Sequence, residues 1–388
     1  MSSSPRTTKN APPSTSVPLT ESLADFREQI LAVRRQLEPQ PFPWYSYDIL
    51  ANVGFIDRLL LDANLSLADL TAGRPVLDIG CADGDLAFFL ETLGCAVTAV
   101  DHPSTNANGM QAVCALRAGL HSSVDVLEAN VDQGFVPPQG ANYGLAVMLG
   151  ILYHLKNPYL VLESLAKYAN YCLLSTRVAR FAPGGTPLHN IPVAYLLDPG
   201  ETNNDITNYW ILSNPGLKRL IRRTGWEICS YLNIGNSESS DPVTAQGDER
   251  AFCLLVRSDA FTNGKLLHGW YDPAGERDGW RWTADSFAIE CFVGWPGKDF
   301  ELELQVYLGE AQLAATGQVR ITISVNGKSL PNEILKNPGV HVIRRSIPSV
   351  QATGTLRFDF TASPTAPGGL DPRILGIVVN SIKLRPSL

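Results

Sequence analysis

The chain has 388 residues and a formal net charge of −7, from 31 basic and 38 acidic side chains. This length suits more than one domain of about 150 residues, and a hydrophobic content of 45% is ordinary for a globular protein. The acidic balance disfavours an extended nucleic-acid surface but leaves room for a local one. No apolar run is long enough to span a bilayer, so we expect no membrane partner.

The seven cysteines contain no C-x-x-C pair, which disfavours a zinc site, and we expect no metal. Their apolar surroundings predict reduced thiols and a cytoplasmic protein. Residues 1–19 are rich in Ser, Thr and Pro and lack the apolar stretch of a signal peptide, so they predict a disordered tail.

The first element in chain order is a helix over residues 20–37, where apolar side chains recur at helical spacing before Pro39. The proline-rich turn 41–47 follows. Its aromatics, Trp44 and Tyr45 among them, suit either a core plug or the wall of a ligand pocket, and the sequence leaves both open. A second helix is expected over 49–61.

Residues 76–101 read as a strand, a glycine-containing turn, a helix and a second strand that ends on Asp101. This layout is typical of folds that bind a nucleoside-bearing cofactor across strand ends. Gly80 and Gly84 are present, but Ala82 takes the place of the middle glycine of a dinucleotide fingerprint.

The loop is also acidic, with Asp78, Asp83 and Asp85 close in sequence. Carboxylates beside a pyrophosphate would be repelled by about 1 to 4 kcal/mol at contact distance. S-adenosylmethionine (SAM) has no phosphate and carries a sulfonium and an ammonium, so the loop predicts a SAM site, with Asp101 on the ribose hydroxyls. A degenerate or unused nucleotide fold is the alternative.

Strands and helices then alternate, which predicts a parallel sheet covered on both faces. Expected strands are 75–80, 96–101, 124–129, 144–149, 172–177, 226–234 and 250–257; expected helices are 85–93, 109–118 with Asn108 as N-cap, 159–169 and 216–223. Right-handed crossovers bring the strand tips to one rim. The residues that we expect there to bind the cofactor are Asp78, Gly80, Cys81, Ala82, Asp83, Gly84, Asp101, His102, Asn130, Val131, Leu149 and Gly150.

The loop after the fourth strand, residues 150–158, contains Tyr153 and His154, which are the candidate catalytic residues. Imidazole titrates near neutral pH, so His154 could take a proton from an attacking hydroxyl or amine. Alternatively it only orients the loop, because positioning supplies much of the rate of methyl transfer.

A long insertion over residues 180–213 shows little periodicity, and loops of that length in compact domains are often functional. Its amides and aromatics predict a substrate lid, although turn chemistry alone would also explain the amides. Candidate acceptor-binding residues here and elsewhere are Trp44, Tyr45, Asn203, Asn204, Asp205, Asn208, Tyr209 and Arg250.

After residue 258 the pattern becomes alternating, as in 300–306, 319–325, 356–360 and 374–384. It predicts an antiparallel, jelly-roll-like β-sandwich over 265–388, joined by a linker at 259–264 to a cofactor domain over 20–258. Trp270, Trp280, Trp282 and Trp295 suit either a glycan-stacking face or a core.

The motifs Asp78–Gly84, Asp101 and Leu149–His154 resemble class I SAM-dependent methyltransferases, over roughly residues 43–257. The resemblance implies a Rossmann-like α/β fold with a seven-stranded sheet. Gly150-Ile151-Leu152-Tyr153-His154 and Asn208-Tyr209-Trp210 are similar to segments of the tRNA wobble-uridine carboxymethyltransferase group, and Arg250 stands where that group has a functional arginine.

That group uses carboxy-SAM and a lysine after a Pro-Trp pair, whereas Tyr45 follows Pro43-Trp44 here. A carboxylate would therefore lose a charge-assisted contact of about 1.5 to 3 kcal/mol, and plain SAM is expected. The C-terminal part, with Trp280-Arg281-Trp282 and Asp371–Gly376, is similar to accessory domains fused to bacterial glycosyltransferases.

These features together predict a SAM-dependent methyltransferase that acts on a hydroxyl of a saccharide, glycoconjugate or related small polar acceptor. The alternatives are a tRNA-modifying (carboxy)methyltransferase and a glycan-binding protein with a vestigial methyltransferase fold.

Overall fold

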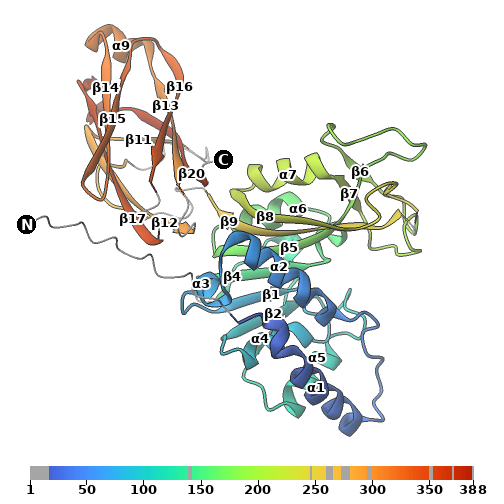
Figure 1. The fold of residues 1–388 in the computed structure, drawn as a ribbon. Coiled ribbons are helices and arrows are strands. Elements are labelled where there is room, and N and C mark those ends of the chain that lie inside the picture. The colour runs from blue at the N-terminus through green and yellow to red at the C-terminus, as the bar shows by residue number, and fades with distance from the viewer. Residues whose placement is uncertain are drawn as a thin grey trace, which may run out of the picture.

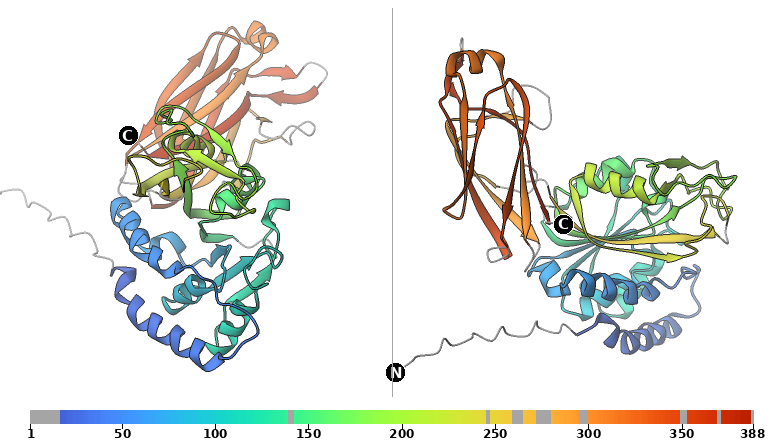
Figure 2. Two further views of the ribbon diagram at one scale, coloured as in Figure 1. Left: turned by 90° about the vertical axis from the view of Figure 1, so that its right-hand side faces the viewer. Right: turned by 45° about the horizontal axis from the view of Figure 1, so that its top comes forward.

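The computed structural model describes residues 17–138, 142–244, 247–258, 265–271, 280–294, 299–348, 353–368 and 371–386. Figures 1 and 2 show an α/β lobe followed by a lobe of antiparallel strands. The linker predicted at 259–264 and Trp295 lie outside the described residues.

The α/β lobe has a central sheet in the order β3-β2-β1-β4-β5-β9-β8. β9 is antiparallel to its neighbours, and β1 to β5 are parallel. The bounds are β1 Val76–Ile79, β2 Val97–Asp101, β3 Asp125–Glu128, β4 Tyr143–Leu149, β5 Ala169–Ala179, β8 Trp226–Gly235 and β9 Glu249–Arg257. This is the sheet of a class I methyltransferase, and it confirms the predicted fold class.

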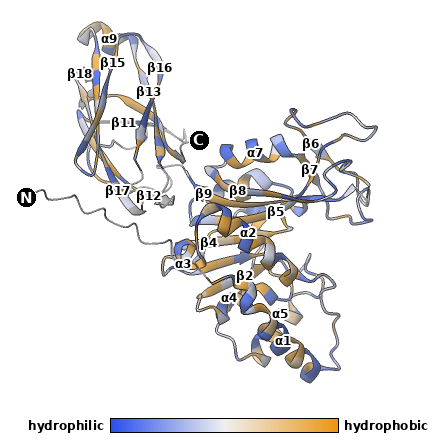
Figure 3. Cartoon of the chain, viewed as in Figure 1, coloured by the Kyte–Doolittle hydropathy of each residue, from blue (hydrophilic) through white to orange (hydrophobic). Residues whose placement is uncertain are grey.

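Helices cover both faces of this sheet (Figure 1). One core contains buried residues of α1, α2, α4 and α5, and another contains those of α6 and α7. The helices are α1 Leu23–Leu37, α2 Val53–Ala63, α3 Leu67–Thr71, α4 Asp85–Thr92, α5 Gln111–Gly119, α6 Pro158–Leu165 and α7 Asn214–Arg223; single 3-10 turns are η1 Leu19–Glu21, η2 Ile49–Asn52, η3 Val131–Gln133 and η5 Leu152–His154. Because both faces of the sheet are covered, every residue of β1 and β5 is buried, and most of these residues are apolar (Figure 3).

Two local expectations were wrong, and helix α3 was not predicted. Helix α5 begins at Gln111 with Met110 as its N-cap, although the Asn108 side chain does accept the N–H of Ala112 at 3.2 Å. Leu19, assigned to the disordered tail, is buried and donates its N–H to Asp57 at 2.8 Å. Helix α3 has only five residues, too few to show a periodicity, and its signal is the capping box of Ser66 and Asp69.

The insertion after β5 contains two short strands, β6 Ala194–Leu196 and β7 Trp210–Ser213, which pair with each other. β7 pairs in parallel with Val178 and Ala179, the last two residues of β5. β4 pairs with β5 only as far as Ser175. β5 therefore projects past β4, and the insertion packs against this projecting end.

The described part of the C-terminal lobe contains two larger antiparallel sheets, in the orders β10-β12-β17-β14-β15 and β11-β20-β13-β16, which Figure 1 shows face to face. β18 and β19 form a further two-stranded antiparallel sheet. A two-residue turn at Asn326 and Gly327, both with positive φ, joins β14 to β15. The bounds are β10 Lys265–Leu266, β11 Arg281–Trp282, β12 Ser286–Gly294, β13 Phe300–Leu308, β14 Val319–Val325, β15 Lys328–Leu335, β16 Gly339–Ile347, β17 Thr353–Ser363, β18 Ala366–Gly368, β19 Asp371–Leu375, β20 Val378–Pro386 and one unexpected helix, α9 Glu310–Thr316.

Alternate residues of β13, among them Phe300, Leu302 and Leu304, are buried, as the alternating pattern predicts. Trp270 is partly buried, packs on Phe287 and donates its indole N–H to the carbonyl of Ala288 at 2.7 Å. These contacts favour the core interpretation for this tryptophan. The two lobes meet where the N–H of Leu384 donates to Ser258 at 3.0 Å.

Candidate functional site

The turn after β1 requires glycine at two positions. Gly80 and Gly84 have φ of 72° and 88°. A Cβ on Gly80 would lie 2.1 Å from Ile151, and a Cβ on Gly84 would lie 2.7 Å from Phe88. Ala82, at the middle position, also has a positive φ of 52°. The turn therefore keeps the backbone of a glycine-rich loop although one glycine is replaced by alanine.

Asp101, at the tip of β2, is held against this turn. Its Oδ2 accepts hydrogen bonds from the Ala82 N–H and the Asn106 amide, both at 2.9 Å, and its Oδ1 accepts the His102 N–H at 2.7 Å. A carboxylate has about four acceptor positions, so Oδ1 keeps room for one more donor. A ribose hydroxyl is such a donor.

Asp78 and Cys81 are buried beside the same turn. Burial raises the pKa of Asp78 to about 7, and the nearby charge of Asp101 adds to this effect. Burial also raises the pKa of Cys81, again with help from Asp78 and Asp101. A buried acid whose ionisation is opposed by a neighbouring negative charge favours a cation at its side. The residues present therefore fit SAM, whose sulfonium and ammonium are positive.

Asp83 serves a different set of partners. It is fully buried, and its carboxylate accepts the Tyr45 N–H and the Asn108 amide at 2.8 Å each and lies 3.4 Å from Arg34. Asp85 also pairs with Arg34, at 2.9 Å. These acids join the cofactor turn to helix α1 and the segment 38–48.

The two candidate aromatic residues of the proline-rich turn, Trp44 and Tyr45, contact different parts of the fold. The Trp44 ring lies 4.9 Å from the Arg34 guanidinium and its indole N–H donates to Glu38 at 3.1 Å, so it packs beside α1. Tyr45 lies nearer the rim: burial raises its pKa to about 12, and the charges of Tyr153, Asp101 and Arg250 act on it. The contacts of Trp44 favour the core interpretation for this residue, and for Tyr45 the pocket interpretation stays a prediction.

His154 is placed by the insertion. Its Nδ1 lies 2.9 Å from the Thr207 hydroxyl and 3.2 Å from the Thr207 carbonyl. The Thr207 hydroxyl donates to Asp205 at 2.6 Å. Because that proton is committed to Asp205, Nδ1 of His154 must be the donor, which leaves Nε2 as an acceptor. Burial lowers the pKa of His154, against the opposing charge of Asp205, so the ring is neutral at neutral pH.

The remaining candidates of the insertion lie around this chain of hydrogen bonds. The Tyr209 N–H donates to the Tyr153 carbonyl at 2.8 Å. Asn203 and Asn204 both have positive φ and form a turn. Asn208 is buried, and its amide donates to the Thr202 carbonyl at 3.1 Å. The insertion is thus ordered against the loop 150–157 by backbone and side-chain contacts.

At the tips of β3 and β4 the candidates have local partners. The Asn130 side chain caps η3 by accepting the Asp132 N–H at 3.1 Å, and Val131 is buried. Gly150, which follows Leu149, has φ of 72°, and a Cβ there would lie 3.6 Å from the Tyr153 hydroxyl. The Arg250 Nη1 lies 3.4 Å from the same hydroxyl.

Sequence reasoning missed Thr207, Asn106 and Arg177. Thr207 stands within the insertion already singled out, but its role depends on a contact across 53 residues. Asn106 lies between the expected strand 96–101 and the expected helix 109–118, and its amide donates to Asp101. Arg177 gave no local signal, because only strand register brings it opposite Arg250. Within the described ranges, no three His, Cys, Asp or Glu side chains gather as they would around a metal ion.

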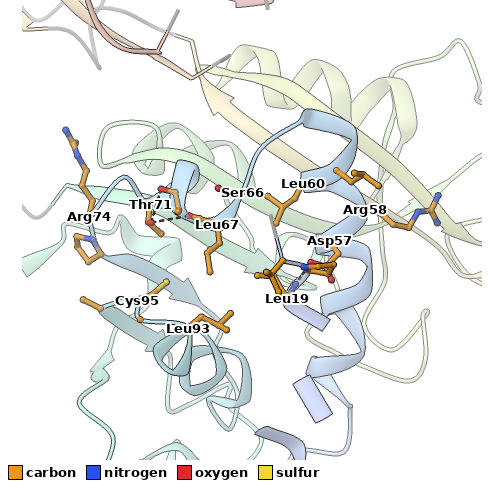
Figure 4. Close-up of a pocket in the computed structure, with 18 residues that line it drawn as sticks. Leu19, Asp57, Arg58, Leu60, Ser66, Leu67, Thr71, Arg74, Leu93 and Cys95 are labelled. Carbon is orange, nitrogen blue, oxygen red and sulfur yellow. Dashed lines mark hydrogen bonds between the residues drawn. The ribbon is translucent and has the colours of Figure 1, made fainter. Parts of the chain in front are cut away.

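A cavity of about 850 Å³ lies elsewhere (Figure 4). Its wall includes Leu19 and Leu60, together with Pro75 and Ala96, which directly precede β1 and β2. It therefore lies at the amino ends of these strands, at the opposite edge from Asp101. It is not the site described above.

Residues 53–231 match a family model described as "Methyltransferase domain". No curated protein is similar enough in sequence to count as a match. No helix of the described residues is long and apolar enough to cross a membrane.

Several solved structures are similar at low identity. They include the N-terminal domain of EvdMO1 with SAH bound (14% identity, 60% of this chain, 96% of that chain, TM-score 0.38) and EvdMO1 itself (11%, 87%, 98%, 0.37). Magnesium protoporphyrin IX methyltransferase from Synechocystis PCC 6803 with bound SAM is a third (16%, 63%, 99%, 0.35).

The family match, the strand order and the acidic rim at Asp78 and Asp101 agree with one another. Residues 53–231, which make up most of the α/β lobe, therefore form a methyltransferase domain.

Proposed function

We propose that the protein transfers a methyl group from SAM to a hydroxyl of a saccharide, a glycoconjugate or a related small polar acceptor. The observation that carries the proposal is the hydrogen-bonded chain Asp205–Thr207–His154, which holds a neutral imidazole with a free Nε2 in the loop after β4. A hydroxyl acceptor must lose a proton, and a neutral imidazole can take it.

The cofactor site proposed here is the rim built from the turn 80–84, Asp101, Asn130 and Gly150. When bound there, SAM supplies an electrophilic methyl group. Asp101 holds a ribose hydroxyl through the free position on Oδ1, while Asp78 faces the positive end of the cofactor. The glycines keep side chains out of the space that the cofactor needs.

His154 is the proposed general base. Thr207 and Asp205 fix its tautomer, so that Nε2 receives the hydroxyl proton as the acceptor oxygen forms its bond to the methyl carbon. Tyr153 and Tyr209 lie beside the proposed base, because Tyr153 precedes His154 in the chain and the Tyr209 N–H donates to the Tyr153 carbonyl. The insertion thus acts as the substrate lid, with Asn203, Asn204 and Asn208 shaping its turns.

Two features support the choice of a saccharide as the acceptor. One is the fused antiparallel lobe, which resembles accessory domains of glycosyltransferases, and the other is the set of polar groups in the insertion. The C-terminal sheets would hold part of a glycan while the methyltransferase domain acts on it. A glycan-binding protein that has lost the reaction is the competing idea, and turnover with any acceptor would exclude it.

The test is methyl transfer from radiolabelled SAM to a panel of mono- and oligosaccharides, analysed by mass. We expect a product 14 mass units heavier with a saccharide, lost in His154→Ala but with SAM affinity kept. Asn204→Ala and Tyr209→Phe should raise the acceptor KM or lower kcat, also with SAM affinity kept. Loss of SAM binding in these lid variants would contradict the assignment of the lid to the acceptor.

A second candidate, tRNA modification, is favoured by one feature. A surface cavity of about 790 Å³ is lined by cations of helix α7 and by one residue of β20, namely Lys218, Arg219, Arg222, Arg223 and Lys383. On an acidic chain this is the kind of local basic surface that binds a phosphate backbone. Retardation of tRNA on a gel, strongly weakened by salt and by Arg219→Glu, would favour this candidate over the saccharide.

A further inference from the structure

The outer face of one sheet of the C-terminal lobe carries a row of side chains that crosses four strands. In the sheet β11-β20-β13-β16, Trp282 lies opposite Val378, and Val378 lies opposite Tyr307. Tyr307 in turn lies opposite Val340. Directly paired residues share one face of a sheet. Because Val379, the residue after Val378, packs in the core, the row faces outward. We call these four outward residues the aromatic row.

The aromatic row is an accessible apolar surface with polar neighbours. Tyr307 is 41% exposed, Val340 is 56% exposed, and Val342 beside them is 45% exposed. Gln305 lies opposite both Val342 and Ser381, one step along the strands from the row. Exposed apolar patches rimmed by polar groups mark binding surfaces. Flat rings next to an amide and a hydroxyl match a sugar, which has apolar C–H faces and hydroxyls at its edge.

The cavity of about 790 Å³ beside helix α7 carries a net positive charge. Helix α7 buries Leu217 and Ile221, and its cations lie four residues apart on the other side of the helix. Arg222 pairs with Glu227 at 3.7 Å. In the described part of the chain, no carboxylate pairs with the other lysines and arginines that line the cavity, which are Lys218, Arg219, Arg223 and Lys383. On a chain with a net charge of −7, this concentration of cations favours an anionic ligand.

The aromatic row and the basic cavity are parts of one surface that spans the two lobes. Lys383 of β20 lines the cavity and is the direct partner of Glu303 on β13. Glu303 precedes Tyr307 by four residues, so both side chains point to the outer face, about 14 Å apart at about 3.4 Å per residue. Figure 1 shows β13, β16 and β20 on the side of the C-terminal lobe that is nearer α7.

An acidic glycan fits this surface better than RNA does. A nucleic-acid strand carries a phosphate at every nucleotide. The outer face beside the aromatic row instead carries Glu301 and Glu303, whose charges are met by Arg344 at 3.6 and 2.8 Å. An acidic glycan can place the faces of its sugar rings on the row, where the charges cancel, and its acidic groups in the cavity.

We propose that the aromatic row and the basic cavity together bind one acidic oligosaccharide, and that this glycan is the acceptor of the methyl group. Sugar rings stack on Trp282 and Tyr307. Carboxylate or phosphate groups of the glycan pair with Lys383 and with the arginines of α7. His189 and Asn190 line the same cavity, so a glycan bound there reaches the insertion. The proposal rests on the proposed function and names the class of its acceptor.

The test compares three probes of four sugar units on the full-length protein, by calorimetry at low ionic strength. The probes are maltotetraose, phosphorylated maltotetraose and tetragalacturonate. We expect at least one acidic probe to bind tenfold tighter or more than the neutral probe, and added salt to reduce this advantage. The acidic probe that binds more tightly identifies phosphate or carboxylate as the anion. No advantage for either acidic probe overturns the proposal.

Single variants locate the binding. Lys383→Gln and Arg219→Gln should each reduce the affinity for the acidic probe about two- to fivefold. Lys328→Gln, exposed on β15 of the other sheet, is the matched control and should change nothing. Tyr307→Ala should weaken the acidic probe about three- to tenfold, whereas Tyr307→Phe keeps the ring and the affinity. Binding that is unchanged in both Lys383→Gln and Tyr307→Ala overturns the proposal.

Two other outcomes are distinguished by further probes. Tighter binding of tetrauridylate than of either acidic glycan, lost in Lys383→Gln, would assign the surface to RNA and overturn the proposal. Methyl transfer to a neutral saccharide, without any preference for acidic probes, would overturn the proposal and leave the proposed function intact. Binding of the acidic glycan without methyl transfer to any saccharide would instead overturn the proposed function and leave only the binding surface.

Discussion

The imidazole of His154 and the hydroxyl of Thr207 lie 2.9 Å apart, although 53 residues separate them in the chain. The contact joins the loop after β4 to the long insertion, and it fixes which nitrogen of the ring carries the proton. Thr207→Val keeps the shape and the backbone carbonyl but removes the hydroxyl. We expect kcat to fall about two- to tenfold with SAM affinity unchanged, as for the loss of one hydrogen bond. An unchanged kcat would show that the Thr207 hydroxyl does not help to position His154, since the Thr207 carbonyl still accepts from Nδ1 in the variant.

The pH dependence of the reaction should report His154. Because burial lowers the pKa of this ring below 6.5, the base is present at neutral pH and is lost only as the pH falls below that value. We expect kcat/KM to be flat near pH 7 and to drop on the acidic side of 6.5. His154→Gln should lower kcat by about 10²-fold or more and remove this acidic limb. A limb that persists in the variant belongs to another group.

Asp101→Ala tests the cofactor site. The change removes the acceptor of the ribose hydroxyl and the anchor of the Ala82 N–H. SAM affinity, measured by calorimetry, should fall at least tenfold, since hydrogen bonds to a charged group contribute about 1.5 to 3 kcal/mol. Asp125→Asn, at the other end of the neighbouring strand and exposed, is the control and should leave the affinity unchanged. Equal affinity in Asp101→Ala would refute the site.

Ala82→Gly should not lower the free energy of unfolding of the protein. Ala82 has φ of 52°, a conformation that costs a side chain about 1 to 2 kcal/mol, while glycine loses about 0.5 to 1 kcal/mol more entropy on folding. Urea unfolding should show a gain of up to about 1 kcal/mol. Ala72, at the end of α3, has φ of 46°, so Ala72→Gly should give a similar gain in the free energy of unfolding. Clear destabilisation of both would mean that neither backbone is strained.

Asp83→Asn should unfold the protein more readily. An amide offers one oxygen where the buried carboxylate serves Tyr45, Asn108 and Arg34, so at least one partner is left unsatisfied. The expected loss in the free energy of unfolding is about 2 to 4 kcal/mol. Asp48→Asn breaks an exposed pair with Arg27 at 2.8 Å and should cost under about 1 kcal/mol. Similar losses in the two variants would contradict a special role of Asp83.

The sequence by itself determined the elements of the sheet, because buried strands and their covering helices have a period and a composition of their own. It placed Gly80, Gly84 and Asp101 at one rim, since parallel strands end together. It also determined the alternation of β13 and β14. Local patterns suffice where the cause is local.

Only the tertiary structure decided what the side chains of that rim contact. Asp83 and Asp101 look alike in sequence, yet Asp101 accepts the Ala82 N–H and keeps one acceptor position, whereas the Asp83 carboxylate is occupied by Tyr45, Asn108 and Arg34. Likewise, only the tertiary structure brings Thr207 next to His154 and Arg177 opposite Arg250. These pairs depend on strand register and on the path of a long insertion, and such contacts leave no periodic trace in the sequence, because each requires only one residue at one place.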